Sequence, residues 1–406
     1  MDHIKQPDRR KPVHVLFFFG ISPTKLGGIE LFASYFAQEM LRRGQNVAFC
    51  FSDEPSDEVR AVLDLPNVVL LRAADQTSFS PRGMSALWDI LQHVKPDIVV
   101  YSFSGILRPL PWICKFAGIK RVVYNDHSSR TSDRVPRGIK RAVANLLTLP
   151  VDTVIAVSDF VRDTSLGERM HRARCFTIPN GIDFSRRESS KPRSDFLARY
   201  GIPADHKVVT QVSWMVPEKG VDTFLRAAAE LLRNRRDIHF ILGGEGRCAK
   251  EYQQMSRDLG ISENVIFTGM LQDPMASGIY AASDVFCLAS RWKEACGLVM
   301  LEAMAFGIPV VASRTGGVQE YVRDGTDGVL VDGDPGAFAS AIASLLDDED
   351  LRKKMGNAAR VRVEEDFSVQ LMARRYCELL QAADAPLVAG LDGFPCMDAS
   401  GCGLTP

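Results

Sequence analysis

The sequence predicts two doubly wound α/β domains, each built on a parallel sheet with helices on both faces. Three observations predict this fold class. Short apolar runs of strand length alternate with amphipathic helical stretches in both halves of the chain, which is the pattern of β-α-β units. The alternation pauses once, near residue 186. The 406 residues suffice for two or three domains, each with its own core.

The first half opens with Val13–Phe19, an apolar run with the length of a buried strand. A glycine-bearing turn follows, and Ile29–Arg43 reads as an amphipathic helix with Leu31, Tyr35, Phe36 and Met40 on one side. Gly44 ends this helix. Further buried strands are expected at Asn46–Phe51, Val68–Leu71, Ile98–Tyr101, Arg121–Tyr124 and Thr153–Val157.

The polar stretch Arg186–Arg193, which contains Pro192, predicts the link between the halves. The alternation resumes at Lys207. Strands are expected at Val208–Val212, Ile238–Leu242, Val265–Thr268, Val285–Leu288, Pro309–Ala312 and Gly328–Val331, and helices at Thr223–Arg233, Gly297–Phe306, Gly336–Leu346 and Val369–Ala382. Open parallel sheets bind ligands at the carboxyl ends of their strands, so the two halves should face each other across a cleft.

Composition excludes several classes of protein. The formal net charge of −1 gives no global reason to expect a nucleic-acid partner. The nine cysteines include no CxxC pair, and their odd number favours a reducing compartment over a disulfide framework. No run of 18 apolar residues is present, and no cleavage site follows the first strand. We therefore expect a cytoplasmic protein with no export signal.

One segment of the second half carries a distinctive pair of carboxylates. It runs from Glu294 to Glu302 with the sequence EACGLVMLE, shortly after the expected strand Val285–Leu288. Gly297 opens a helix whose free N–H groups and positive dipole end suit a phosphate. Glu302, inside that helix, can accept two hydrogen bonds from a ribose diol, and Glu294 can reach sugar hydroxyls. Two isolated glutamates would more simply be a surface residue and a helix-stabilising one.

The segment resembles the E-x7-E signature of retaining GT-B glycosyltransferases, in particular of glycosyltransferase family 4. The features that follow keep the family's order: GIPVVA at 307–312, GGVQE at 316–320, Gly325, and GVLV at 328–331. IPNGID at 178–183 resembles the segment that ends the family's first domain. The resemblance covers about residues 13–377. It implies a GT-B fold, with two Rossmann-like domains across a cleft, and a donor site that includes Gly244, Glu294, Cys296, Gly297, Leu298 and Glu302.

The resemblance also implies a role for each part of the chain. Residues 1–185 would form the acceptor-binding domain and residues 186–365 the domain that binds the nucleotide-sugar donor. Residues 366–384 would form a helix that packs back towards the first domain. Residues 385–406, rich in glycine and small residues, are expected to be a disordered tail.

A second motif, Pro217-Glu218-Lys219-Gly220, follows the strand Val208–Val212. A lysine in such a loop can neutralise a departing diphosphate, although a solvated turn is the commoner place for a lysine. The resemblance favours the diphosphate role. In the family an arginine usually lies five residues earlier, where this chain has Trp214. Arg291, Lys293 and Arg247 are candidate substitutes, and backbone N–H groups are another.

Two loops of the first half complete the expected site. Gly27 and Gly28 follow the first strand, resemble the family's glycine loop, and would bind the donor phosphate across the cleft. Asp126 and His127 follow the strand Arg121–Tyr124. His127 aligns with a family histidine near the transferred sugar, and both residues are candidates for acceptor contact. Asp126 either orients His127 or caps its own loop.

A basic run, Arg134, Arg137, Lys140 and Arg141, has helical spacing. It is either a solvated helix face or a contact with an anionic membrane surface or a lipid-diphosphate acceptor. The second alternative would place the protein peripherally on the inner face of the membrane.

The resemblance implies transfer with retention at the anomeric carbon, in which the leaving diphosphate helps to deprotonate the acceptor hydroxyl. His127, Lys219 and Glu294 are the catalytic candidates. No metal-binding motif is evident, so we expect metal-independent chemistry with a UDP- or GDP-sugar as co-substrate and no further cofactor. The acceptor would be a glycan, a lipid-linked molecule or a small molecule, in cell-envelope or polysaccharide biosynthesis. Two alternatives are a sugar-nucleotide epimerase and a catalytically silent GT-B binding protein.

Overall fold

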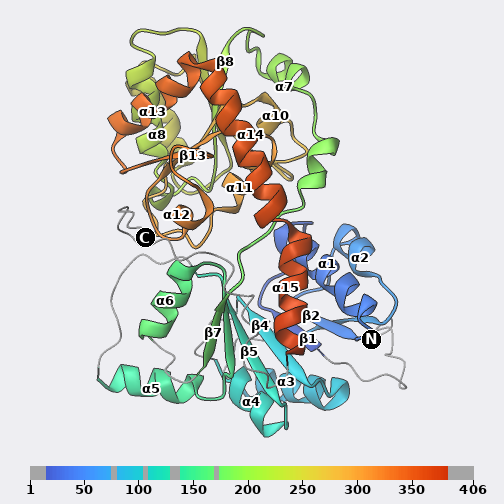
Figure 1. The fold of residues 1–406 in the computed structure, drawn as a ribbon. Coiled ribbons are helices and arrows are strands. Elements are labelled where there is room, and N and C mark those ends of the chain that lie inside the picture. Colours follow the sequence, from blue (N-terminus) through green and yellow to red (C-terminus); the bar gives the residue numbers. More distant parts are fainter. Residues whose placement is uncertain (1–14, 75–79, 104–107, 129–137, 169–172, 383–406) are drawn as a thin grey trace, which may run out of the picture.

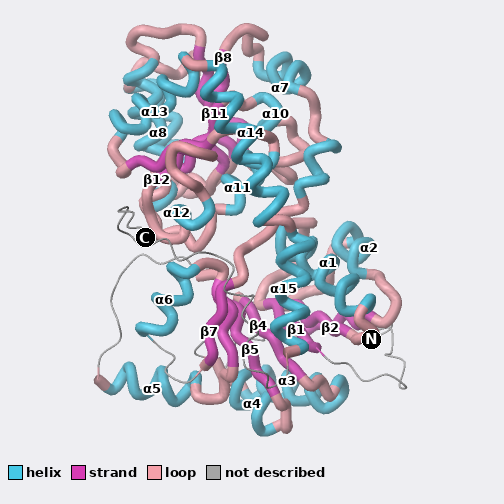
Figure 2. The backbone as a smooth tube through the Cα atoms, in the orientation of Figure 1, coloured by secondary structure: helices cyan, strands magenta, loops and turns pink. Residues whose placement is uncertain are grey.

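The computed structural model describes residues 15–74, 80–103, 108–128, 138–168 and 173–382, which form two α/β domains stacked end to end (Figure 1). Each domain has one parallel sheet with helices packed outside it, as the alternation predicts (Figure 2). The tail at 385–406, expected to be disordered, lies outside the described residues.

The N-terminal sheet has seven strands, and every neighbouring pair in it is parallel. In spatial order they are β3 (Val68–Arg72), β2 (Val47–Phe51), β1 (Val15–Phe19), β4 (Ile98–Ser102), β5 (Arg121–Asp126), β6 (Thr153–Ala156) and β7 (Arg174–Thr177). The order reverses direction between β1 and β4. Loops that leave the carboxyl ends of these two strands diverge to opposite sides, which opens a crevice at that edge.

Helices cover both faces of this sheet. They are α1 (Gly28–Arg42), α2 (Asp57–Leu63), α3 (Pro81–Val94), α4 (Leu110–Phe116), α5 (Ile139–Thr148) and α6 (Asp159–Glu168). Alternate residues of each strand face opposite layers, so Phe17 and Phe19 pack under α1, whereas Leu16 and Phe18 pack against the layer of α3 and α4.

The C-terminal sheet has six parallel strands: β10 (Val265–Gly269), β9 (Ile238–Gly243), β8 (Lys207–Val212), β11 (Val285–Leu288), β12 (Val310–Ser313) and β13 (Gly328–Val331). Its helices are η1 (Phe184–Ser189), α7 (Arg193–Tyr200), η2 (Pro217–Lys219), α8 (Val221–Leu231), α9 (Ala249–Asp258), α10 (Ile279–Ala282), α11 (Leu298–Ala305), α12 (Val318–Tyr321), α13 (Pro335–Asp347) and α14 (Glu349–Asp366). One core layer lies under α11 and α14, and the other under α8 and α13.

The chain crosses between the domains twice, and the two crossings pair with each other. Ile182, on the outgoing segment, donates to Phe367 O at 2.9 Å and accepts from Val369 N at 2.9 Å on the returning one. A Cβ at Gly181 would lie 2.4 Å from Ser368 O, so only glycine allows this approach. The returning helix α15 (Val369–Gln381) then packs on α1, with the rings of Tyr376 and Phe32 4.8 Å apart (Figure 1).

The structure differs from the sequence prediction at two places in the first domain. β7 was not predicted, because this edge strand has exposed and half-buried side chains and therefore no apolar run. The face of α1 was partly wrong, since Phe32, Phe36 and Met40 are buried whereas Leu31 and Tyr35 are half-buried. α1 is covered by both the sheet and α15, which shifts its buried stripe.

Candidate donor site

The predicted donor residues meet where the carboxyl ends of the two sheets face each other. Gly28 begins α1 in the N-terminal domain, and Leu298 begins α11 in the C-terminal domain. A Cβ at Gly28 would lie 3.6 Å from Leu298 Cδ1, so the two helix starts approach across the cleft. Amino ends of helices carry free N–H groups and positive partial charge, and their convergence suits a diphosphate.

Lys219 and Glu294 form a direct ion pair within the C-terminal domain. The Lys219 ammonium lies 2.6 Å from Glu294 Oε1, which also accepts from Ser290 Oγ at 2.7 Å. Glu294 is 5 % exposed, whereas the Lys219 side chain is 25 % exposed, so the pair joins a buried carboxylate to a partly accessible cation. Glu294 Oε2 accepts no hydrogen bond from the described residues, which leaves it for a sugar hydroxyl.

The loop of Lys219 is locked to the loop of Glu294 through backbone contacts. Glu218 O accepts from Arg291 N at 2.9 Å and from Trp292 N at 3.1 Å. Gly220 has φ +63°, and a Cβ there would lie 1.8 Å from Ala289 O. A side chain at 220 would therefore separate the loops and break the ion pair.

Glu302 points from α11 towards Tyr280, whose hydroxyl donates to Glu302 Oε2 at 2.7 Å. Burial raises the pKa of Glu302 to about 7, against the opposing effects of this hydrogen bond and of the positive charges on Arg186 and Lys25. A carboxylate in this place can accept hydrogen bonds from a ribose, and its charge state changes near neutral pH. The sequence did not point to Tyr280.

One backbone amide of the glycine loop in the N-terminal domain is hydrogen-bonded to a side chain of the helix that follows. Gly27 N donates to Glu30 Oε2 at 3.0 Å, and burial raises the pKa of Glu30. The Gly27 amide is thus engaged, and Gly28 and Ile29, in the first turn of α1, are left to contact a phosphate.

Asp126 and His127 lie at the carboxyl end of β5 but differ in access. Asp126 is 2 % exposed and accepts from Ser128 N at 3.0 Å and from Ser128 Oγ at 2.5 Å, so it caps its own loop. The ring of His127 stacks on Phe103 with centroids 4.6 Å apart. Burial lowers the pKa of His127 to about 4, with the Asp126 charge opposing the shift. A neutral imidazole can contact an acceptor hydroxyl, whereas the buried Asp126 carboxylate cannot in this conformation.

Trp214, where the family has arginine, is 58 % exposed at the carboxyl end of β8. Of the cations considered as substitutes, Arg291 pairs with Asp222, Arg247 lies 3.5 Å from Glu218 Oε2, and Lys293 lies in the loop before Glu294. A cation that the sequence had not pointed to is Lys25, on the loop before Gly28. Lys25 is exposed, forms no ion pair with the described residues, and its charge acts on both Glu30 and Glu302.

Two further predicted residues act through the backbone. Gly244 has φ +126°, and a Cβ there would lie 2.1 Å from Ser213 O, so this glycine lets the β8 and β9 loops pack together. Cys296 is 3 % exposed, and burial raises the pKa of its thiol to about 12, with Tyr321 and Asn180 as hydrogen-bond partners. Its side chain therefore supports the loop, and only its backbone can meet a donor.

The described residues include only part of the predicted basic run. Arg134 and Arg137 lie outside them, and Lys140 and Arg141 belong to α5, but the side chains of these two residues are not described. Within the described part of the chain, no helix is both long and apolar enough to cross a bilayer. No group of three or more potential metal ligands occurs among the described residues.

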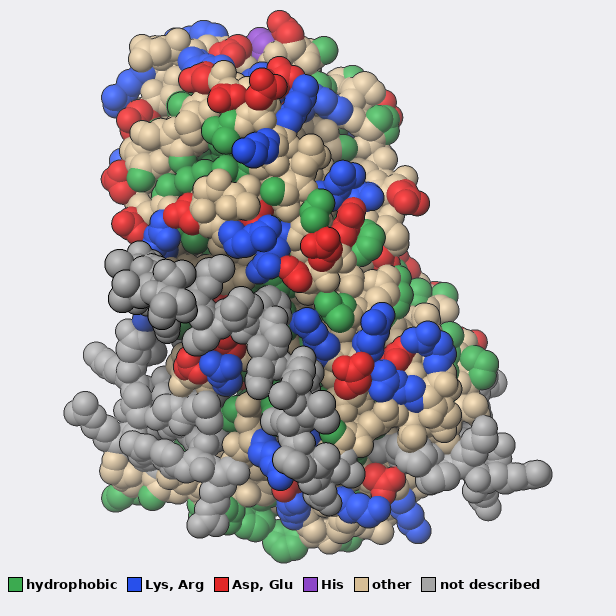
Figure 3. Space-filling model, in the orientation of Figure 1, with side chains coloured by type: hydrophobic (Ala, Val, Ile, Leu, Met, Phe, Trp, Pro, Cys, Tyr) green, Lys and Arg blue, Asp and Glu red, His purple; other side chains and the backbone are tan. Residues whose placement is uncertain are grey.

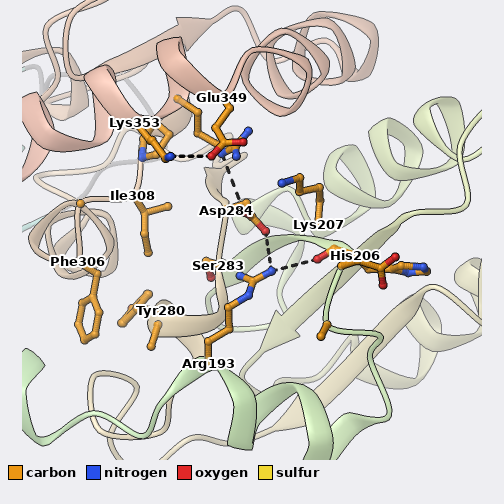
Figure 4. Close-up of a pocket in the computed structure, with 16 residues that line it drawn as sticks. Arg193, His206, Lys207, Tyr280, Ser283, Asp284, Phe306, Ile308, Glu349 and Lys353 are labelled. Carbon is orange, nitrogen blue, oxygen red and sulfur yellow. Dashed lines mark hydrogen bonds and ion pairs between the residues drawn. The ribbon is translucent and has the colours of Figure 1, made fainter.

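A cavity of about 480 Å³ lies at the opposite end of the C-terminal sheet, near the amino ends of β8, β11 and β12 (Figure 4). Its charged groups are largely paired with one another. Arg193 lies 3.1 Å from Asp284, and Lys353 lies 2.7 Å from Glu349. It contains none of the predicted donor residues.

Comparison with known proteins decides the family. The profile described as Glycosyl transferases group 1 matches residues 192–362, and that of Glycosyltransferase Family 4 matches residues 26–186. This chain belongs to glycosyltransferase family 4. The glycosyltransferase therefore has the GT-B fold, as its motifs indicated, and the two matched segments correspond to its two sheets.

Relatives of this glycosyltransferase span nearly its whole length. It is 29 % identical to the GDP-mannose-dependent alpha-(1-6)-phosphatidylinositol monomannoside mannosyltransferase of Mycolicibacterium smegmatis, over 88 % of this chain and 96 % of the relative. Among solved structures, a glycosyltransferase from Rickettsia africae superposes with a TM-score of 0.75 at 20 % identity, over 91 % of this chain and 98 % of that one. Anabaena HepE in complex with UDP superposes with a TM-score of 0.73 at 21 % identity, over 91 % and 100 % of the two chains.

Proposed function

We propose that this glycosyltransferase transfers mannose from GDP-mannose to a hydroxyl of a lipid-linked acceptor in cell-envelope biosynthesis, with retention at the anomeric carbon and without a metal. The Lys219–Glu294 pair beside the start of α11 carries the proposal, because it joins a cation for the diphosphate to a carboxylate for the sugar. The choice of GDP-mannose and a lipid acceptor rests on the relative from Mycolicibacterium, whose name specifies both.

In the proposed reaction, the bond between the anomeric carbon and the diphosphate oxygen breaks while the acceptor oxygen bonds to the same face of the sugar. The acceptor proton passes to the departing diphosphate. Lys219, the amides at the starts of α11 and α1, and Lys25 stabilise the negative charge that develops. Lys25 would thus supply from the N-terminal domain part of the charge that the family's arginine supplies at position 214. Glu294 Oε2 holds a sugar hydroxyl, and His127 contacts the acceptor.

The proposed donor can be tested with the purified chain. GDP, UDP, ADP and their sugars would be screened by thermal shift and calorimetry, followed by donor hydrolysis assays with and without EDTA. We expect GDP to bind most tightly and GDP-mannose to be hydrolysed slowly in the presence of EDTA. Preference for UDP would change the donor, and loss of hydrolysis with EDTA would contradict metal independence. A chain that binds nucleotide sugars but hydrolyses none would be a silent GT-B binding protein, and a chain that does neither would contradict the proposed activity.

We also propose that α5 contributes to a peripheral membrane contact. Ile139 is 83 % exposed and Leu146 58 % exposed on α5, and Phe116 on neighbouring α4 is 74 % exposed. Hydrophobic side chains line this lower edge of the N-terminal domain in Figure 3. α5 also carries Lys140 and Arg141 and no acidic residue, a composition that suits an anionic bilayer. α5 lies far from the cleft, so the contact would anchor the enzyme and not deliver the acceptor (Figure 1).

The double variant Ile139→Ser/Leu146→Ser should lose most of its binding to vesicles that contain anionic lipid, because each exposed apolar side chain contributes about 1.5–3 kcal/mol when buried. Vesicle co-sedimentation would measure this. A matched control is Val361→Ser, which changes an exposed apolar residue of the C-terminal domain (44 % exposed) and should leave binding unchanged. Equal sedimentation of the double variant and the parent chain would contradict the contact.

A further inference from the structure

Glu320, on the C-terminal domain, binds the first turn of a helix of the other domain. Its Oε2 accepts from Asp159 N at 2.6 Å and its Oε1 from Phe160 N at 2.7 Å. Asp159 and Phe160 begin α6, so one carboxylate satisfies two amides that the helix leaves unpaired. The negative charge also lies at the positive end of the α6 dipole. Each of these effects favours the contact between the domains.

Tyr321, the next residue, strengthens the same junction. Its hydroxyl donates to Val157 O at 2.5 Å, at the end of β6, and accepts from Asn180 N at 3.1 Å, on the outgoing crossing. Tyr321 is 1 % exposed. The short helix α12 (Val318–Tyr321) therefore contacts the N-terminal domain through two consecutive side chains, the carboxyl group of Glu320 and the hydroxyl of Tyr321.

The same segment is fastened directly to the loop that carries the donor-site glutamate. Gly317 N donates to Glu294 O at 2.8 Å. A Cβ at Gly317 would lie 2.3 Å from Ala295 O and 2.7 Å from Ser158 Oγ, so the backbone at 317 is wedged between the donor loop and the N-terminal domain. The segment from Gly317 to Glu320 therefore contacts the donor loop at one end and α6 at the other.

From this geometry we propose that Glu320 is an interdomain positioning residue, which holds the Glu294–Cys296 loop in register with the N-terminal domain during transfer. The effect on kcat that we expect from this contact rests on the proposed function. Glu320 is not among the predicted donor or acceptor residues, and its carboxylate is engaged by the amides of α6. It sets the distance between the donor, held mainly by the C-terminal domain, and His127 and the Gly27–Gly28 loop on the other domain. Small misplacements of reacting groups have large kinetic effects.

The test compares Glu320→Ala and Glu320→Gln with Asp334→Ala. Asp334 is a matched control, because its carboxylate also caps a helix, accepting from Ala337 N at 2.9 Å, but wholly within the C-terminal domain. In Glu320→Ala, kcat should fall by about tenfold to a hundredfold while the dissociation constant for GDP changes by less than about twofold. Glu320→Gln, which keeps the shape but has one acceptor oxygen, should lie between. Asp334→Ala should keep the parent kcat.

Hydrogen exchange gives a readout that does not depend on activity. Peptides that cover 157–164 should lose protection in Glu320→Ala and keep it in Asp334→Ala, since only the first variant frees the amides of Asp159 and Phe160. Unchanged exchange at these amides, or a fall in GDP affinity as large as the fall in kcat, would overturn the proposal. If the parent chain transfers no sugar, the proposed function fails, and exchange alone decides whether Glu320 joins the domains.

Discussion

Replacing Lys219 by alanine should lower kcat by about a hundredfold to a thousandfold, the usual cost of removing one donor aimed at developing negative charge. Lys219 Nζ lies 2.6 Å from Glu294 and stands at the carboxyl end of β8, where the diphosphate would depart. Trp214 cannot replace its charge, and Arg291 is held by Asp222. Steady-state kinetics of donor hydrolysis or of transfer would measure the effect.

The Lys219→Ala variant has a second consequence, which must be separated from the first. Glu294 is 5 % exposed, and removal of its partner leaves a buried carboxylate unpaired, which can cost about 3–5 kcal/mol of stability. The double variant Lys219→Ala/Glu294→Gln removes both charges and should recover thermal stability without recovering kcat. Lys250→Ala, at an exposed lysine of α9, serves as the neutral control. A Lys219→Ala variant within threefold of the parent kcat would refute the diphosphate role.

The fold could be predicted because strand and helix signals agree along most of the chain. β11 and β13 were predicted with their observed ends, since each is a short apolar run that begins directly after an aspartate. β7 could not be predicted, because an edge strand needs no apolar run once β6 supplies its hydrogen bonds. The α1 stripe was misjudged because α15, about 330 residues later in the sequence, covers part of α1.

The motifs named candidate donor residues in both domains, but they did not reveal the contacts between those residues. The motifs named both Lys219 and Glu294, but their ion pair depends on the close approach at Gly220, which spacing does not reveal. Tyr280 and Glu320 act through contacts with other segments, and Lys25 acts on Glu302 through its charge. GGVQE was quoted as a family marker, and nothing in its letters shows that its glutamate binds a helix of the other domain.

Replacing Glu302 by alanine should weaken GDP binding by about a hundredfold, because a charged acceptor contributes about 1.5–3 kcal/mol to each hydrogen bond it makes and a ribose offers two hydroxyls. Calorimetry would measure it. The variant also leaves the Tyr280 hydroxyl without its partner, so Glu302→Gln, which keeps an acceptor, is the matched control. Glu302→Gln should bind GDP more tightly than Glu302→Ala and less tightly than the parent. A Glu302→Ala variant that binds GDP like the parent would exclude the ribose contact.

The pKa of Glu302 makes the same contact dependent on pH. Burial raises this pKa to about 7, and ribose hydroxyls donate to the ionised form, so GDP binding should release a proton. Affinity should rise about tenfold from pH 6 to pH 8, because the ionised fraction rises by that factor. The free energy of unfolding has the opposite dependence on pH. Because the pKa of Glu302 is higher in the folded state, the protonated carboxyl favours folding, and this contribution to stability is lost as pH rises from about 4.5 to 7. Glu302→Gln should therefore bind GDP with little pH dependence and, at pH 8, melt at a higher temperature than the parent. If Glu302→Gln both loses the pH dependence of GDP binding and gains thermal stability at pH 8, Glu302 is the group that titrates.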